Sequence, residues 1–303
     1  MKTSACLSKV QYGIYAECVG QEDKPCYNTP YFYILDGSLD AARLCKAVET
    51  TVATHPTLFT RIELDGEGEP LQTIQHDETF SLHVEEVTDI EAVKPQLIVP
   101  FKIVGDRLFH IRLFRDSQHF YLFIDIHHII NDGTSLKTIL SDIDKAYKGE
   151  PLEPEILTMA DVAAAEAPLR QSPAFEEAKR WYASQFDCSD TYTPLLPDLD
   201  SPQQSEAHLL RTLSLDPDRL NAFLKDNGIF KSNFFTSVYA FLLAKYAGGQ
   251  EALFTTVYNG RTDKRFLHSV GMTVKTLPVY AKFTNDTTVI DFLRQGLKKY
   301  IER

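Results

Sequence analysis

The chain has 303 residues, 44% of them hydrophobic and 24% charged, and its 31 lysines and arginines against 42 aspartates and glutamates give a formal net charge of −11. This length and apolar content predict two domains or lobes, each with a core. The acidic balance argues against nonspecific nucleic-acid binding, which requires clustered positive charge. No stretch approaches the roughly eighteen consecutive apolar residues of a membrane span.

The amino terminus and the cysteines both indicate a cytoplasmic protein. The first residues hold one early lysine and no apolar run long enough for a secretory signal. An odd number of cysteines, without a Cys-x-x-Cys pair or close histidines, argues against a disulfide framework or a zinc site. We therefore expect reduced thiols. The five cysteines are Cys6, Cys18, Cys26, Cys45 and Cys188.

Helical and strand patterns alternate from the amino terminus onward, which is typical of an α/β fold. Aspartate-glycine and glycine-rich turns separate the first elements. The predicted elements are a helix at Ser8–Cys18, a strand at Tyr31–Leu35, a helix at Leu39–Thr54 capped by Ser38, a hairpin of Leu58–Leu64 and Pro70–Gln75, a strand at Phe80–Val87 and a weak helix near Ile90–Ile98.

The clearest strands are two apolar runs, Leu108–Phe114 and Phe120–Ile126, joined by a polar turn. We expect them to be adjacent core strands. After the second strand come the residues HHIINDGTS (127–135) and a helix through about Tyr147, whose apolar residues recur at helical spacing.

Proline-containing loops around an alanine-rich segment (161–167) change the pattern between Pro151 and Pro202. We place the lobe boundary here, with an N-terminal lobe at 1–170 and a crossover helix and partial second lobe at 171–303. Helices are predicted at Ala174–Phe186, Pro217–Lys225, Asn233–Ala247 and Val289–Arg303, and strands at His208–Ser214, Ala252–Tyr258 and Val274–Phe283. Because the chain ends in or just after a helix, we expect an incomplete structural unit.

The most unusual pattern is His127-His128-x-x-x-Asp132-Gly133. Successive side chains of a strand point to opposite faces, so the two histidines cannot enter one cavity. His128 continues the apolar face of Ile126, where lost hydration lowers the pKa of an imidazole and keeps it neutral near pH 7. A neutral imidazole accepts a proton, so His128 is the candidate general base and His127 a supporting residue.

Asp132 and Gly133 end the strand. Gly133 permits a tight turn, and Asp132 is available to cap the helix that begins near Thr134 or, alternatively, to pair with an arginine from the same lobe. Single histidines at strand ends are more often structural than catalytic, but two in a row before Asp-Gly favour catalysis. Their opposed faces, and the absence of an HExxH motif or another ligand cluster, argue against a metal site.

Other catalytic motifs are missing from the sequence, which has no GxSxG elbow, no GxxxxGK[ST] loop and no GxGxxG at a strand-to-helix turn. No serine or cysteine nucleophile stands beside the histidines. The simplest chemistry is direct attack of one substrate on another, with His128 deprotonating or positioning the nucleophile. The residues therefore favour group transfer between two bound substrates.

HHIINDG resembles the HHxxxDG signature of condensation domains of nonribosomal peptide synthetases and of related chloramphenicol-acetyltransferase-like acyltransferases. Further segments resemble condensation domains in the same order, so the resemblance covers nearly the whole chain. They are Leu7–Tyr15 (the LSxxQ opening helix), His55–Arg61 (RHExLRT), Leu157–Asp161 with the helix at Glu177–Phe186 (the crossover between lobes), and Asn259–Arg261 followed by Val270–Pro278 (GR…VGxFVNTLP).

Three departures from the family pattern affect the site. Phe59 stands at a position where the family has arginine, so the arginine expected to pair with Asp132 is Arg61. Thr273 and Lys275 replace the family's phenylalanine and asparagine, which alters the expected substrate contacts. The family's later HQDxPFE-like segment is missing, so we expect a truncated piece of a larger synthetase.

The resemblance implies two chloramphenicol-acetyltransferase-like α/β lobes in a V-shaped pseudo-dimer, the second incomplete, with a tunnel between them. Donor and acceptor groups would arrive as phosphopantetheine thioesters on two carrier proteins, beside an adenylation domain and without a directly bound cofactor. His128 would position or deprotonate the acceptor amine. His127, Asp132 and Gly133 would shape the loop, and Ser135 would contribute a hydrogen bond as a substrate-binding residue.

Two alternatives stay open: another acyltransferase or an epimerisation domain of the same superfamily, and a noncatalytic module that recruits a partner. The intact HHxxxDG motif argues against the second, because a scaffold has no need of His128. The cluster of Arg261, Lys264 and Arg265 is expected in a solvated loop, with docking of an acidic carrier protein as the alternative.

Overall fold

The computed structural model describes residues 2–21, 23–185, 193, 195, 209–261 and 263–301. The chain divides into two compact units, Met1–Glu176 with Tyr258–Lys275, and Glu177–Val257 with Thr276–Arg303. Residues 258–275 thus belong to the first unit although they come late in the chain. The expected lobes at 1–170 and 171–303 stay a prediction. Within the described ranges, no helix combines the length and apolar character needed to cross a membrane.

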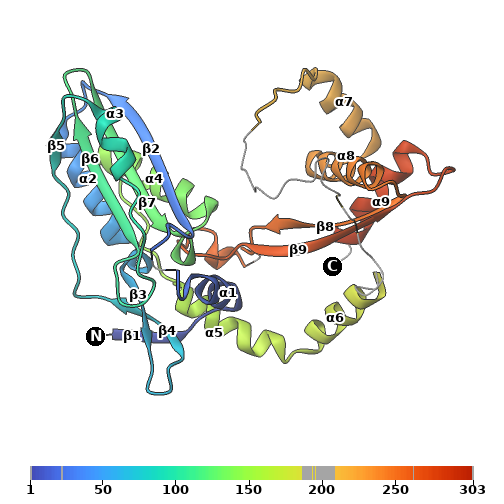
Figure 1. Cartoon of the computed structure of the whole chain (residues 1–303), viewed down its shortest axis with the longest axis horizontal. Coiled ribbons are helices and arrows are strands. Elements are labelled where there is room, and N and C mark those ends of the chain that lie inside the picture. Colours follow the sequence, from blue (N-terminus) through green and yellow to red (C-terminus); the bar gives the residue numbers. More distant parts are fainter. Residues whose placement is uncertain are drawn as a thin grey trace. The chain divides into compact units, whose positions relative to one another are not determined.

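A four-stranded sheet with the order β2-β7-β6-β5 forms the centre of the first unit (Figure 1). Strands β6 and β7 pair antiparallel, which confirms the two predicted core strands, and β2 pairs antiparallel with the other side of β7. The strand predicted at Phe80–Val87 is limited to the short β5. The four strands are β2 (Asn28–Asp36), β5 (Val84–Glu86), β6 (Phe109–Arg115) and β7 (His119–His127).

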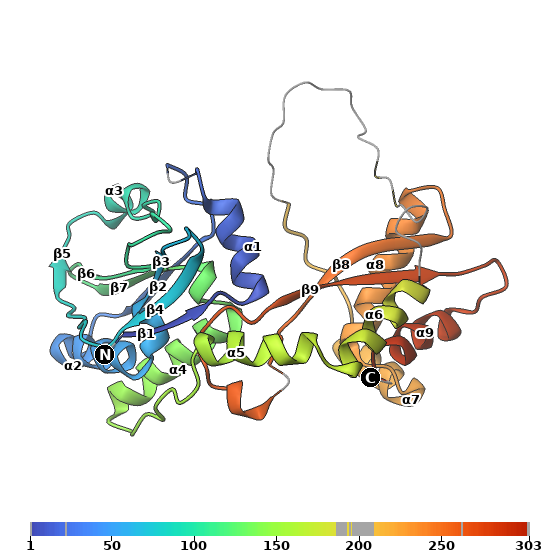
Figure 2. The same ribbon diagram turned by 90° about the horizontal axis from the view of Figure 1, so that it is seen from below.

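Helices cover both faces of this sheet (Figure 2). Helices α2 (Ala41–Thr54) and α4 (Gly133–Lys148) pack against each other on one face, and the short α3 (Ile90–Val93) lies on the other. The N-cap of α2 is Asp40, whose carboxylate accepts the amide of Arg43, so the predicted cap at Ser38 is wrong.

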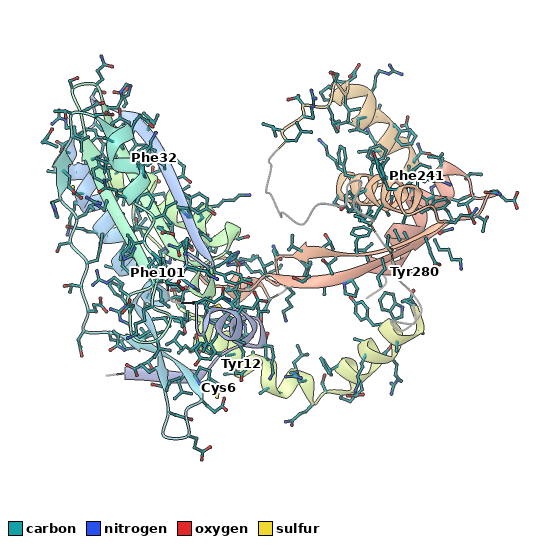
Figure 3. All side chains as sticks on the ribbon, viewed as in Figure 1. Cys6, Tyr12, Phe32, Phe101, Phe241 and Tyr280 are labelled. Atoms are coloured by element: carbon teal, nitrogen blue, oxygen red, sulfur yellow. The ribbon has the colours of Figure 1, made fainter. Side chains whose placement is uncertain are left out.

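The alternation of side chains along β7 divides the apolar residues between two clusters. Leu122, Ile124 and Ile126 point into the main core with α2 and α4, whereas Tyr121 and Phe123 join the smaller cluster under α3. The main core also contains Phe101, which Figure 3 labels beside these strands. This packing positions the carboxyl end of β7, where the two histidines lie.

A second, three-stranded sheet has the order β1-β4-β3, with β1 at Lys2–Cys6, β3 at Thr60–Leu64 and β4 at Pro70–Gln75. The antiparallel β3–β4 pair confirms the predicted hairpin, whereas β1 was not predicted.

The opening helix of the chain, α1 (Lys9–Cys18), is as expected, and Ser8 and Gln11 form a capping box at its start. The alanine-rich segment, expected among loops, is the helix α5 (Met159–Arg170), which contacts β1.

The second unit contains a two-stranded sheet of β8 (Glu251–Tyr258) and β9 (Lys275–Lys282) and a core around Phe283 and Phe292. The strand predicted at His208–Ser214 is wrong for 209–214, which are irregular; His208, Phe186 and Cys188 lie outside the described residues. The later helices match the predictions within a few residues and are α6 (Pro173–Gln185), which spans the division between the units, α7 (Pro217–Asn227), α8 (Lys231–Tyr246) and α9 (Val289–Ile301).

Candidate functional site

The two histidines lie at the point where β7 changes into a short 3-10 turn. Strand β7 ends at His127, and His128 begins the turn His128–Ile130. The prediction that the strand alternation includes His128 is therefore wrong. The side chain of His127 is buried, at 1% exposure, whereas His128 is half-buried. The change of backbone direction therefore separates the two imidazoles into different environments.

The hydrogen bond of His128 determines which of its ring nitrogens is free. Its Nδ1 lies 2.6 Å from the backbone oxygen of Asn131. A carbonyl oxygen only accepts, so Nδ1 carries the hydrogen, and a neutral ring keeps an unprotonated Nε2. That nitrogen has the lone pair a general base needs.

The contacts of His127 give it the opposite tautomer. The amide of Ile129 donates to its Nδ1 over 3.2 Å, so a neutral ring carries its hydrogen on Nε2, which lies 3.6 Å from Sγ of Cys18. Burial is the main cause that lowers the pKa of His127 to about 4, and burial raises the pKa of the Cys18 thiol to about 11. Both groups are therefore neutral near pH 7. The roles of His128 as the base and of His127 as a supporting residue stay predictions.

The lowered pKa of His127 predicts a pH-dependent stability. The unfolded ring titrates near 6.5 and the folded ring near 4, so the stabilisation is complete above pH 6.5 and is lost as pH falls toward 4. This difference corresponds to about 3 kcal/mol in the free energy of unfolding. Urea unfolding between pH 4 and 7 should therefore show that the free energy of unfolding depends less on pH in His127→Asn than in the wild type.

The matched control for this measurement is His268→Asn, because His268 is exposed. The free energy of unfolding of this variant should change with pH as it does in the wild type. A wild-type profile that His127→Asn leaves unchanged would contradict the assignment of the titrating group.

Asp132 is the N-cap of α4, as one of the two predicted roles requires. Its Oδ1 accepts the amides of Thr134 and Ser135 at 3.1 and 2.9 Å. Gly133 begins the helix without a positive φ, and a Cβ there would have no heavy atom within 4 Å. The tight turn predicted for Gly133 is therefore wrong.

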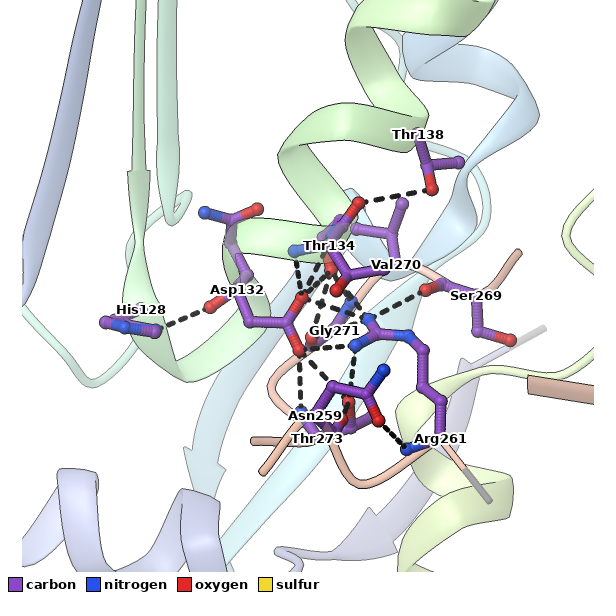
Figure 4. Close-up of polar contacts among 12 residues, drawn as sticks. His128, Asp132, Thr134, Thr138, Asn259, Arg261, Ser269, Val270, Gly271 and Thr273 are labelled. Atoms are coloured by element: carbon purple, nitrogen blue, oxygen red, sulfur yellow. Dashed lines mark hydrogen bonds and ion pairs between the residues drawn. The ribbon is translucent and has the colours of Figure 1, made fainter. Parts of the chain in front are cut away.

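Asp132 also makes a buried, bidentate ion pair, so both predicted roles apply. Its partner is Arg261, with Nη1–Oδ2 at 2.7 Å and Nη2–Oδ1 at 3.0 Å, and both side chains are 0% exposed (Figure 4). The expected partner, Arg61, instead binds Glu78. The prediction of a solvated loop is likewise wrong for Arg261, because residues 258–275 pack into the first unit.

Thr273 and Ser135 complete the polar network around this ion pair. Thr273 donates its amide and its Oγ1 hydroxyl to Oδ2 of Asp132, at 3.2 and 3.0 Å. The Ser135 hydroxyl accepts the amide of Gly271 at 2.9 Å and lies 2.8 Å from Oδ1 of Asp132. Burial would raise the pKa of Asp132, but the hydrogen bonds and charge of Arg261, together with Ser135, lower it. Ser135 is fully buried within this network, and its role as a substrate-binding residue stays a prediction.

Two further residues that sequence reasoning did not single out support the site. Gln11 donates to the backbone oxygen of Ile129 at 3.1 Å, which ties α1 to the turn after the histidines. Glu155 accepts the amides of Thr57 and Val270 at 3.1 and 2.7 Å, and burial is the main cause that raises the pKa of Glu155 to about 7. A signal for Gln11 was present in the LSxxQ segment, whereas nothing near Glu155 indicated its role.

Gly260 allows the backbone before Arg261 to approach Thr273. Its φ is +70°, and a Cβ there would lie 1.9 Å from the carbonyl oxygen of Thr273. We expect Gly260→Ala to destabilise the protein by more than the roughly 1–2 kcal/mol that a left-handed conformation costs an alanine. Gly20→Ala is the matched control, since Gly20 has a φ of +82° and a Cβ there would have no heavy atom within 4 Å. Equal losses in urea unfolding would contradict the close approach.

The sequence of the chain is similar to those of known proteins. The sequence profile of the condensation domain matches residues 1–301. Over 286 residues the chain is 27% identical to bacitracin synthase 3 of Bacillus licheniformis, covering 90% of this chain and 4% of that protein. Over 276 residues it is 29% identical to tyrocidine synthase 3 of Brevibacillus parabrevis, covering 89% of this chain and 4% of that protein. The chain thus spans about 4% of the length of these relatives.

Solved structures share the fold. The condensation domain of the monacolin K polyketide synthase MokA has a TM-score of 0.84 at 19% identity, over 99% of this chain and 72% of that chain. The epimerization domain of the third module of tyrocidine synthetase B has a TM-score of 0.81 at 17% identity, over 99% and 73%. These likenesses agree with the α/β class predicted from the sequence.

Proposed function

The chain belongs to the condensation-domain family, and from this premise we propose that it forms an amide bond between a donor acyl or peptidyl group and an acceptor aminoacyl group. Both groups would be phosphopantetheine thioesters on carrier proteins, next to an adenylation domain in a synthetase. A V-shaped pseudo-dimer of two chloramphenicol-acetyltransferase-like lobes is part of the proposal. The observation that carries it is the free Nε2 of the half-buried His128, given by the hydrogen bond from its Nδ1 to Asn131.

The proposed reaction needs one proton acceptor. The acceptor amine attacks the donor thioester carbonyl, a C–N bond forms and the C–S bond breaks. Nε2 of His128 takes a proton from the attacking nitrogen and passes it to the departing thiolate, so the site returns to its starting state. An α-amine is partly neutral near pH 7, so orienting the amine by His128 is the other contribution the ring can make.

The network behind His128 favours this role. Asp132, Arg261, Ser135 and Thr273 are buried and hydrogen-bonded to one another, and they hold the start of α4 directly after the histidine turn. A base held by such a support keeps its geometry during the reaction. The proposed catalytic atom is thus Nε2 of His128, and the network residues position it.

The test is reconstitution of the full-length protein with loaded donor and acceptor carrier proteins. Mass spectrometry should detect a dipeptidyl thioester on the acceptor carrier, and the same mixture with an unloaded donor should not form it. An acceptor residue with inverted configuration and no amide would favour epimerisation, and transfer from a coenzyme A thioester would favour another acyltransferase. If carriers bind but no group is transferred, the protein recruits partners and the proposed reaction is wrong.

A further inference from the structure

Tyr27 has a strained backbone next to the two histidines. Its φ is +59°, and in the part of the chain that the structure describes it is the one residue other than glycine with a positive φ. The left-handed region is unfavourable for a bulky L-residue, because its Cβ approaches the following carbonyl oxygen. Such strain persists where surrounding contacts hold the residue, and it occurs preferentially at functional sites.

The contacts that hold Tyr27 include the proposed base. Its backbone oxygen accepts the amide of His128 at 2.8 Å, next to the paired residues Asn28 of β2 and His127 of β7. The centroid of its ring lies 6.3 Å from that of His128, at an interplanar angle of 69°, and 6.4 Å from that of His127. One residue therefore contacts both the backbone and the ring of His128.

The side chain of Tyr27 is itself anchored to another element. Its hydroxyl donates a short hydrogen bond to the carboxylate of Glu17 in α1. This bond is the main cause that raises the pKa of Tyr27 to about 12, so the phenol stays protonated and remains a donor. The same helix contacts the histidine segment through Cys18 and Gln11. The hydroxyl of Tyr27 thus anchors its ring to α1, while its backbone oxygen binds the amide of His128.

We propose that Tyr27 is a positioning residue for His128: its left-handed backbone presents a carbonyl to the His128 amide, and its anchored ring limits the orientation of the imidazole. This inference rests on the proposed function, because it assigns the effect to the chemical step. It predicts that the orientation of His128 depends on the tyrosine side chain more strongly than the stability of the fold does.

The decisive variant is Tyr27→Gly, because glycine adopts a positive φ without strain. Relief of this strain should offset part of the lost ring contacts, so we expect the protein to remain folded at assay conditions. We expect kcat for amide formation to fall about 10–100-fold, as for a slightly misplaced catalytic group, with KM for the loaded carrier proteins nearly unchanged. Tyr27→Phe keeps the ring and the carbonyl but removes the hydrogen bond to Glu17, so its kcat should fall between those of Tyr27→Gly and the wild type.

Two controls separate positioning from general loosening of the loop. Asp23→Gly places a glycine at an exposed position of the same connection and should keep wild-type kcat. The ¹⁵N resonances of the His128 ring, measured without substrate, should shift in Tyr27→Gly and remain in place in Asp23→Gly.

The outcomes distinguish this inference from the proposed function. With an active wild type, an unchanged kcat in Tyr27→Gly overturns the positioning role. With a wild type that forms no amide, the proposed function fails, and the ring resonances then decide: a shift in Tyr27→Gly supports positioning of His128, and unchanged resonances refute it.

Discussion

Replacing His128 by alanine is expected to lower kcat for amide formation by about 10²–10⁴-fold, the usual contribution of a positioned acid–base group. The physical reason is the loss of the unprotonated Nε2, which the hydrogen bond between Nδ1 and Asn131 keeps available. The fold should change little, since the variant removes one hydrogen bond of a half-buried side chain, worth about 1 kcal/mol. Single-turnover formation of the dipeptidyl thioester measures the effect on the chemical step.

The matched control is His268→Ala, which removes an exposed imidazole of the first unit and should retain full activity. Asp132→Asn keeps the imidazole and the helix cap but leaves the buried charge of Arg261 unpaired, so its kcat should fall between those of His128→Ala and the wild type. Unchanged product formation by His128→Ala would refute the catalytic assignment of this residue.

Removing Arg261 is expected to have the largest effect on stability. Arg261→Ala leaves the buried carboxylate of Asp132 without its bidentate partner, and breaking one side of a buried ion pair costs about 3–5 kcal/mol. The variant also leaves the backbone oxygen of Ser269 without the donor that lies 3.1 Å away. Chemical denaturation at pH 7 measures the loss in the free energy of unfolding.

Arg265→Ala is the control for this prediction. Arg265 pairs with Asp263 at the surface, where such pairs contribute at most about 1 kcal/mol. The double variant Arg261→Met/Asp132→Asn removes both buried charges together and should recover part of the stability, because no unpaired charge remains. Similar losses in the free energy of unfolding for Arg261→Ala and Arg265→Ala would show that the pair of Arg261 and Asp132 is not buried in solution.

Local patterns predicted most elements of the fold correctly. The alternating runs before and after residue 117 became β6 and β7, and the apolar stripe after Gly133 became α4, because strand and helix periodicity depend on near neighbours. The errors were local as well. Asp40 rather than Ser38 caps α2, because the helix begins two residues later than predicted.

The site was predicted where its chemistry is local and mispredicted where it is not. The cap formed by Asp132 follows from its place before a helix, whereas the strand rule failed for His128 because β7 ends one residue earlier. The ion pair joins residues 129 positions apart, and no periodicity indicates such a partner. Arg61 was the nearer choice in sequence, but Glu78 neutralises it.

The sequence by itself determined most of the helices and strands, the HHxxxDG segment and the family to which the chain belongs, because these depend on residue types at short spacing. Only the tertiary structure decided that Arg261 is the partner of Asp132 and that His127 is the deeply buried imidazole. It also placed the strained Tyr27 against His128. The physical reason is that burial and pairing depend on which distant segments pack together, and desolvation then sets which charges must be neutralised.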